Sequence, residues 1–373
     1  MSQLRSLILA ALGVSVMCIS SAMSAQNPKV LAIGAPAPDF NLPGVDGKMH
    51  ALKDFAAAKV LVIVFTCNHC PTAQAYEQRI MQLDADYKDK GVALVAINPN
   101  DPQALRLDEL GYTDLSDSLE EMKIRAKERG FRFPYLHDGD TQAVSLAFGV
   151  QATPHVFIFD AERKLRYAGR VDDSEKGNPK SQDARNAIEA LLAGKQVPVE
   201  TTRVFGCSTK WSDKREDARR SIEKWDAEAV NLKPIDAEAV ARLAKNDSKK
   251  LRLINVWATW CGPCVIELPE LVTMNRMYRG RDFEMITISM DAADRKDRAL
   301  QMLKKLHVSS ANCIYGAEEK DRLADALDKE WSGALPMTVL VAPGGKLIYR
   351  KTGQVDPLEL KRAIVGYLGR TYQ

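Results

Sequence analysis

The chain has 373 residues, of which 46% are hydrophobic and 27% are charged, a composition typical of a globular protein. Its length allows two hydrophobic cores, or three. The formal net charge of +3 is too small to favour a nucleic acid or an acidic surface as the partner. The composition therefore predicts a globular protein of more than one domain that binds no nucleic acid.

Residues 1–25 have the pattern of a signal peptide. Arg5 precedes a short apolar run from Leu7 to Ile19, and small residues follow as far as Ala25. The run is shorter than the ~20 apolar residues that a membrane-spanning helix needs. We therefore expect removal of residues 1–25 on export, a mature protein without a stable membrane span, and a periplasmic or otherwise exported location. A lipid anchor on Cys18 and an uncleaved N-terminal anchor are the alternatives.

Residues 60–65 predict a buried strand that leads into Cys67-Asn68-His69-Cys70. Apolar residues at helical spacing follow over residues 73–83. A Cys-x-x-Cys pair between a strand and a helix is typical of a redox-active dithiol. Because a helix N-terminus favours the thiolate, we expect Cys67 to attack a disulfide and Cys70 to resolve the mixed disulfide.

His69 lies between these two cysteines in the sequence. A ring beside the first sulfur can stabilise its thiolate, and a stabilised thiolate makes the disulfide more oxidising. We therefore predict that the first dithiol is more oxidising than any second one in the chain. The alternative is that His69 is an exposed loop residue with little effect.

A turn cluster at residues 98–102 and an amphipathic helix over residues 115–129 come next. Thr153-Pro154 then leads into a strand over residues 155–160, and a helix is expected over residues 182–193.

Residues 195–230 predict a connector that contains Cys207 and then a highly charged run, expected to be a solvated helix. Cys207 is a candidate third redox sulfur that reaches back to Cys67 or Cys70. A small buried hydrophobe is the alternative role for a single cysteine. Cys313 is expected to be structural, and a bridge between Cys207 and Cys313 stays open.

Residues 251–257 predict a second buried strand, which leads into Cys261-Gly262-Pro263-Cys264 and a helical pattern of apolar residues. By the same reasoning, Cys261 is the expected nucleophile and Cys264 the resolving sulfur. A structural zinc site would need four ligands, and no second pair lies nearby in the sequence. We therefore expect no metal.

The second half of the chain repeats the order of elements in the first. Strands at 92–97 and 283–288, an X-Pro before a further strand, and a final helix occur in both. This order predicts two copies of one domain, over residues 30–194 and 231–373. It also predicts that both Cys-x-x-Cys pairs occupy the same structural position, with neither pair deep in a core.

The stretch from Val256 to Cys264 resembles the thioredoxin superfamily, and in particular its TlpA/ResA-like branch. Pro269 matches the kink in the active-site helix of that superfamily. Residues 34–175, which open with Ala37-Pro38-Asp39-Phe40, resemble redoxin domains of the AhpC/TSA type. The resemblance implies an α/β protein of two tandem thioredoxin-like domains, each a central mixed β-sheet flanked by helices, with no organic cofactor.

The same resemblance implies roles for further residues. Glu267 is the candidate proton acceptor, because Asn255 stands where thioredoxin carries a buried Asp. Thr153-Pro154 and Leu335-Pro336 match cis-proline loops, which lie against the sulfurs and pair with a substrate strand.

The implied function is that of an exported thiol–disulfide oxidoreductase acting on protein thiols and disulfides, with a membrane electron donor as a candidate partner. Three alternatives remain open. A thiol peroxidase is suggested by Cys70-Pro71-Thr72, although Cys67 replaces the Thr of peroxiredoxins. A Cu(I) carrier would use the first cysteine pair with His69 and His155. A binding module would hold both pairs as inert disulfides. The direction of electron flow is not fixed by these patterns.

Overall fold

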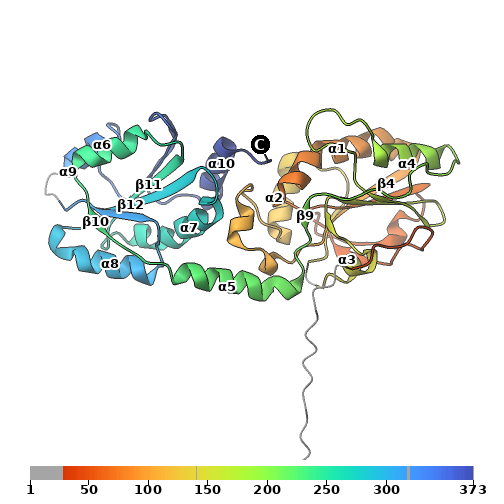
Figure 1. Ribbon diagram of the computed structural model, residues 1–373, viewed down its shortest axis with the longest axis horizontal. Coiled ribbons are helices and arrows are strands. Elements are labelled where there is room, and N and C mark those ends of the chain that lie inside the picture. The colour runs from red at the N-terminus through yellow and green to blue at the C-terminus, as the bar shows by residue number, and fades with distance from the viewer. Residues whose placement is uncertain (1–27, 140, 317–319, 373) are drawn as a thin grey trace, which may run out of the picture.

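A computed structural model of the chain describes residues 28–139, 141–316 and 320–372 (Figure 1). The signal peptide predicted at residues 1–25 lies outside this range. Two mixed β-sheets, of five and six strands, are each flanked by helices. The predicted fold class, two tandem thioredoxin-like domains, is therefore confirmed. Within the described ranges, no helix combines the length and the hydropathy needed to cross a bilayer.

The sheet of the first domain has the strand order β5-β4-β3-β7-β8. Strands β3, β4 and β5 are parallel, whereas β7 runs antiparallel to both β3 and β8. Every residue of β3 is buried, as expected for an apolar run in a sheet covered on both faces. The strands are β3 (Val60–Phe65), β4 (Val92–Asn98), β5 (Tyr135–His137), β7 (His155–Phe159) and β8 (Leu165–Gly169).

The helices of the first domain begin where the sequence supplies a cap. The helix predicted from residue 115 begins at Leu119, because the Ser118 hydroxyl accepts a hydrogen bond from the Glu121 N–H. The helices and short strands are α1 (Pro71–Tyr87), α2 (Leu119–Arg129), α3 (Ala143–Phe148), α4 (Asp183–Leu192), β1 (Asn41–Pro43), β2 (Met49–Ala51) and β6 (Ala152–Thr153), and the 3-10 turns are η1 (Leu52–Phe55), η2 (Lys88–Lys90), η3 (Pro102–Ala104) and η4 (Leu107–Leu110).

The connector contains a short strand and a charged helix. Strand β9 (Cys207–Ser208) pairs with β6 of the first domain, and η5 (Ser212–Lys214) leads into α5 (Arg215–Asp226). Arg215 at the start of α5 forms an ion pair with Asp101 of the first domain. At the other end, Asp226 pairs with Arg276 of the second domain, so α5 contacts both domains (Figure 1).

The sheet of the second domain has the strand order β10-β13-β12-β11-β14-β15. Strand β11 is fully buried between parallel β12 and antiparallel β14. The elements are β10 (Lys233–Pro234), β11 (Leu251–Trp257), β12 (Phe283–Ser289), β13 (Ala311–Ile314), β14 (Met337–Val341), β15 (Leu347–Thr352), α6 (Ala237–Lys245), α7 (Gly262–Tyr278), η6 (Ala293–Arg295), α8 (Lys296–Lys305), α9 (Lys320–Leu327) and α10 (Pro357–Leu368). The Asp356 carboxylate caps α10.

The C-terminal segment of the second domain packs against the first domain. The buried Asp114 carboxylate pairs with Arg370 at 2.5 Å and with Arg362 at 3.4 Å. The Tyr278 hydroxyl donates to the Thr113 carbonyl oxygen at 2.8 Å. These contacts bring the C-terminus close to the first domain, between the two sheets (Figure 1).

Candidate active site

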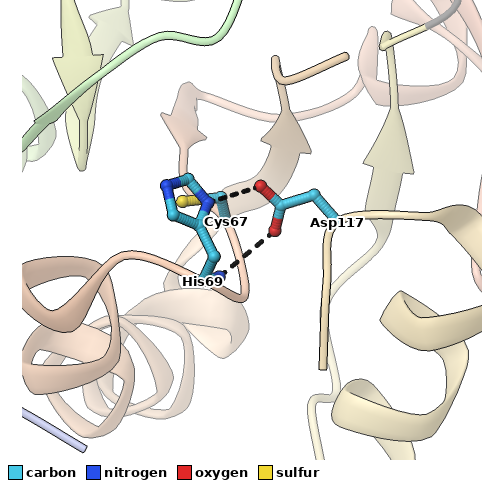
Figure 2. A group of neighbouring side chains, drawn as sticks. All are labelled: Cys67, His69 and Asp117. Atoms are coloured by element: carbon cyan, nitrogen blue, oxygen red, sulfur yellow. Dashed lines mark hydrogen bonds and ion pairs between the residues drawn. The ribbon is translucent and has the colours of Figure 1, made fainter. Parts of the chain in front are cut away.

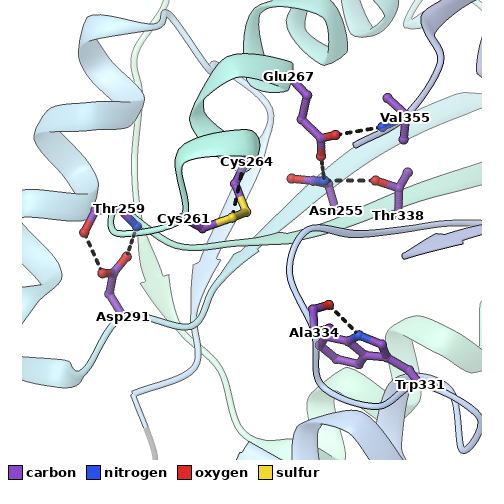
Figure 3. Close-up of a disulfide and its surroundings, with 10 residues drawn as sticks. All are labelled: Asn255, Thr259, Cys261, Cys264, Glu267, Asp291, Trp331, Ala334, Thr338 and Val355. Carbon is purple, nitrogen blue, oxygen red and sulfur yellow. Dashed lines mark hydrogen bonds between the residues drawn. A yellow bond between two sulfur atoms is a disulfide. The ribbon is translucent and has the colours of Figure 1, made fainter. Parts of the chain in front are cut away.

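In the second domain, Cys261 is the N-cap of α7 and is bonded to Cys264 in a disulfide (Figure 3). The Cys264 backbone N–H lies 3.3 Å from the Cys261 sulfur. The neighbouring Trp260 side chain is 54% exposed. The sequence predicted this placement, in which the first sulfur receives the free N–H groups and the positive end of the helix dipole.

The Leu335–Pro336 peptide bond is cis, as the resemblance implied. Strand β14 begins directly after it at Met337, which pairs with Val256 of β11. The substrate-binding role of this loop stays a prediction.

Glu267 lies on α7 and is buried. It accepts hydrogen bonds from the Asn255 side-chain amide at 2.8 Å and from the Val355 N–H at 3.0 Å (Figure 3). Burial raises the pKa of its carboxyl, and these two donors offset only part of that effect. A buried carboxyl with a raised pKa, on the same helix as the dithiol, holds its proton more readily than an exposed one and is a candidate for proton transfer.

Asp291 fixes the loop that leads into the second dithiol. Its carboxylate accepts from the Thr259 N–H at 2.9 Å and from the Thr259 hydroxyl at 2.7 Å (Figure 3). Sequence reasoning missed this residue, because it follows the adjacent strand β12 and no local motif marks it.

In the first domain, Cys70 rather than Cys67 is the N-cap of the active-site helix, α1. The sheet register gives the same result. Phe65 pairs with His155 directly after one cis-Pro, and Val256 pairs with Met337 directly after the other. Counting five positions on from Phe65 and from Val256 leads to Cys70 and to Cys261 respectively.

The expectation that both Cys-x-x-Cys pairs share one structural position is therefore wrong by three residues. Cys70 is the counterpart of Cys261, and Ala73 stands where the second domain has Cys264. The Ala73 N–H lies 3.4 Å from the Cys70 sulfur, as the Cys264 N–H does from Cys261 at 3.3 Å. Pro71 stands at the first helical position, which Pro favours, so the helix begins after Cys70 rather than after Cys67.

Thr153 contacts both sulfurs of the first pair. Its hydroxyl lies 3.1 Å from the Cys67 sulfur, and its carbonyl oxygen lies 3.4 Å from the Cys70 sulfur. The Thr153–Pro154 bond is cis, again as the resemblance implied.

The two thiols of the first pair differ in acidity. Burial alone would raise the pKa of the Cys70 thiol, but hydrogen bonds with Cys207 and Cys67, and the positive charge of His69, hold it well below its usual value. Burial raises the pKa of Cys67 well above its usual value, and the charges of Cys70 and Asp117 raise it further. Electrostatics therefore favour Cys70 as the attacking sulfur, which reverses the order expected from the sequence.

His69 is buried and is not an exposed loop residue, so that alternative is wrong. Its Nδ1 lies 2.6 Å from an Asp117 carboxylate oxygen (Figure 2). Burial by itself would lower the pKa of His69, but the charge and hydrogen bond of Asp117 outweigh burial, so the pKa is raised. The ring is thereby favoured as a cation beside Cys70.

Asp117 is a second site residue that sequence reasoning missed. One carboxylate oxygen accepts from the backbone N–H groups of Asn68 and His69, and the other accepts from the His69 ring and from the Asn100 amide at 2.7 Å. Burial would raise the pKa of Asp117, but these donors, led by His69, lower it. Asp117 lies within the helix expected over residues 115–129, and no motif there marks it as a site residue.

Ligand atoms of Cys67, His69 and Asp117 lie within 4.8 Å of one another, which is close enough for a metal ion (Figure 2). Both Asp117 oxygens are already held by hydrogen-bond donors, and Nδ1 of His69 is one of them. A metal would have to replace these bonds, so the donor set does not fit one. His155, the other residue of the copper alternative, packs on the Phe157 ring at 4.3 Å, and burial lowers its pKa to about 3.

Strand β9 covers the first pair. Cys67 is 3% exposed and Cys70 is fully buried, and in the second domain Cys261 is 7% exposed and Cys264 is fully buried. The expectation that neither pair lies in a core is therefore wrong for both pairs. Half-buried Cys207 lies against them, with its backbone N–H 3.4 Å from the Cys70 sulfur. Cys313 is also free but lies on β13 of the other sheet, so the bridge to Cys207 that the sequence left open is not formed.

Comparison with known proteins gives the following matches. The Redoxin family model matches residues 32–188 and 232–364, which together exceed half of the chain. The thiol:disulfide interchange protein HelX of Rhodobacter capsulatus is 28% identical over 36% of this chain and 74% of its own. The thiol-disulfide oxidoreductase ResA of Geobacillus thermodenitrificans is 25% identical over 50% of this chain and 90% of its own. The crystal structure of an uncharacterized conserved protein from Geobacillus kaustophilus is 39% identical over 50% of this chain and 95% of its own, with a TM-score of 0.45.

Proposed function

This chain belongs to the Redoxin family, and we propose that it is an exported thiol–disulfide oxidoreductase that exchanges disulfides with protein thiols. The names of HelX and ResA support the reaction class. We assign the two redoxin regions to domains at residues 30–194 and 231–373, joined by the connector at 195–230. Export rests on the signal-peptide pattern of residues 1–25, and a membrane protein is the proposed electron donor.

The observation that carries the proposal is the Cys261–Cys264 pair at the tip of α7, beside a cis-Pro loop. The helix N-terminus stabilises a thiolate on Cys261, which attacks one sulfur of a substrate disulfide. One substrate sulfur leaves as a thiolate, and a mixed disulfide forms. Cys264 then attacks Cys261 and releases the second substrate thiol, with Glu267 as the acceptor of the Cys264 proton.

In the first domain we assign the attacking role to Cys70, with His69 as the cation that favours its thiolate. Asp117 acts through His69 and is a positioning residue. Because a stabilised thiolate favours the reduced form, the disulfide of this site is the more oxidising of the two.

The test is reduction of a protein disulfide by the reduced full-length chain, with insulin as the probe. We expect Cys261→Ser to abolish most of the turnover and Cys313→Ser to leave it unchanged. Equal turnover by wild type and Cys261→Ser would show that the second domain does not carry out the exchange.

A thiol peroxidase is the second candidate, and the burial of Cys70 favours it. A buried sulfur is more readily reached by a small peroxide than by a protein disulfide. The Cys70 thiolate would attack one peroxide oxygen and give a sulfenic acid and water, and a second thiol would then form a disulfide and release another water. Thiol-dependent peroxide consumption that is lost in Cys70→Ser but kept in Cys261→Ser would favour this function.

A further inference from the structure

Strand β9 pairs with β6, the short strand that leads into the cis Thr153–Pro154 bond of the first domain. Cys207 pairs with Thr153 in antiparallel register. An extended segment paired at this edge takes the position expected for a substrate strand. The chain therefore fills its own substrate position and brings a third sulfur to it.

Gly206 permits this close approach. Its φ is +139°, and a Cβ built on it would lie 2.0 Å from the Thr153 carbonyl oxygen. Any side chain here would therefore push β9 away from β6. Glycine at this position holds the strand, and with it Cys207, against the site.

Cys70 lacks the resolving partner that its counterpart has. Ala73 occupies the place of Cys264, so the second sulfur of a disulfide must come from outside α1. Cys67 and Cys207 are the two candidates, since both pack against Cys70.

The causes of their acidity separate these candidates. The pKa of Cys67 is raised first by burial, which persists whatever Cys70 does, and only after that by its hydrogen bond with Cys70 and by nearby charge. The pKa of Cys207 is raised first by its hydrogen bond with Cys70 and then by burial and by the charge of Cys70. The contribution of Cys70 disappears once its sulfur has formed a mixed disulfide, so Cys207 becomes more acidic at the step that needs its thiolate.

We propose that Cys207 is the resolving cysteine of the first domain and that β9 is a built-in substrate strand, so that this site turns over through a Cys70–Cys207 disulfide. The proposal rests on the proposed function of disulfide exchange. Because β9 pairs with the β6 edge, it can also displace a product strand that is bound there.

The step balances with a disulfide as the oxidant. The Cys70 thiolate attacks R–S–S–R′, the S–S bond breaks, and R′S⁻ leaves and takes a proton from solvent. The Cys207 sulfur then attacks Cys70, forms the protein disulfide and expels RS⁻, which takes the Cys207 proton. Two protein thiols are oxidised, and one substrate disulfide is reduced to two thiols.

Oxidised glutathione is the probe, applied to the full-length reduced chain with Cys261→Ser and Cys264→Ser to silence the second site. After acid quenching and alkylation, peptide mapping without reductant identifies the disulfide. We expect a link between Cys70 and Cys207, which lie 137 positions apart, and two glutathione molecules released per chain. A link between Cys67 and Cys70 as the main product would overturn the proposal.

Two pairs of variants test the chemistry and the strand separately. Cys207→Ser should slow release of the second glutathione by at least about tenfold, whereas Cys313→Ser should not. Gly206→Ala should slow the same step by displacing β9, and Gly194→Ala, with φ +67° and open space around it, controls for backbone strain. Release at the wild-type rate in Cys207→Ser, or in Gly206→Ala, would contradict the proposal.

The outcomes also separate this inference from the proposed function. If the first domain has no exchange activity, glutathione is not released at all. If only the inference fails, two glutathione molecules are released and the disulfide maps to Cys67 and Cys70.

Discussion

Asp117→Asn should raise the pKa of Cys70, because Asp117 acts on that sulfur through the His69 ring. The substitution keeps one acceptor oxygen, which can serve the backbone N–H groups of Asn68 and His69. It loses the charged oxygen that faces the His69 ring and Asn100. Without that charge the buried ring becomes neutral, since burial by itself lowers the pKa of His69.

The His69 charge is one of the causes that lower the pKa of Cys70, so the Cys70 midpoint should rise when the ring becomes neutral. Two hydrogen bonds to a charged group are worth about 1.5–3 kcal/mol each, and removing one partner of a buried pair costs about 3–5 kcal/mol. We therefore expect the first domain to lose ~3–5 kcal/mol of local stability.

The stability loss depends on pH. The raised pKa of His69 stabilises the fold below about 6.5, its unfolded value, and this is lost as pH rises through the folded value. The lowered pKa of Asp117 stabilises the fold above about 3.9, and this is lost as pH falls through the folded value. The difference between wild type and Asp117→Asn should therefore be largest between about pH 4 and 6.5.

Thiolate absorbance in the ultraviolet, taken as the difference from a matched Cys70→Ser chain, gives the Cys70 midpoint. Hydrogen exchange of peptides from β3 gives the local stability of the first domain. Tryptophan fluorescence does not report on this domain, because all five tryptophans lie at or beyond Trp211. Asp138→Asn is the matched control, since that buried carboxylate bonds to Ser145 instead. An unchanged Cys70 midpoint in Asp117→Asn would refute the role of the His69–Asp117 pair.

Two further predictions concern the second domain. Because the pKa of Glu267 is raised, the free energy of unfolding should fall as pH rises from about 4.3 through the folded value. Glu267→Gln should remove this pH dependence when unfolding by urea is measured across that range. An identical pH dependence in the variant would exclude a raised pKa. Arg370→Ala should lower the free energy of unfolding by only about 1–2 kcal/mol, because Asp114 keeps its contact with Arg362 and Arg370 is partly exposed. The same variant should speed proteolysis of the connector. Unchanged proteolysis would mean that this ion pair does not hold the domains together.

Local patterns predicted most of the fold. The apolar runs at residues 60–65 and 251–257 became the buried central strands, and the final helix expected in the second half is α10. The cis bonds at Pro154 and Pro336 came from the resemblance alone, because local sequence does not separate cis from trans. The helix predicted from residue 115 begins at 119, where Ser118 supplies the cap.

The first site was harder to predict, because its arrangement depends on contacts between distant segments. Equal Cys-x-x-Cys spacing suggested equal placement, but α1 starts at Pro71, after the second cysteine of its pair, whereas α7 starts at Gly262, after the first cysteine of its pair. The Asp117 contact with His69 spans 48 positions, and the β6–β9 pairing joins the domain to its connector. No hydrophobic period marks either contact.

A redox titration of the full-length chain in glutathione buffers, with each cysteine quantified by alkylation and mass spectrometry, tests the central claim most directly. We predict that Cys261, Cys264, Cys70 and Cys207 oxidise and reduce reversibly, that Cys70 and Cys207 do so at the more oxidising potential, and that Cys313 stays a thiol throughout. A chain in which Cys70 and Cys261 keep one state across the range, while Cys313 responds, would contradict the account.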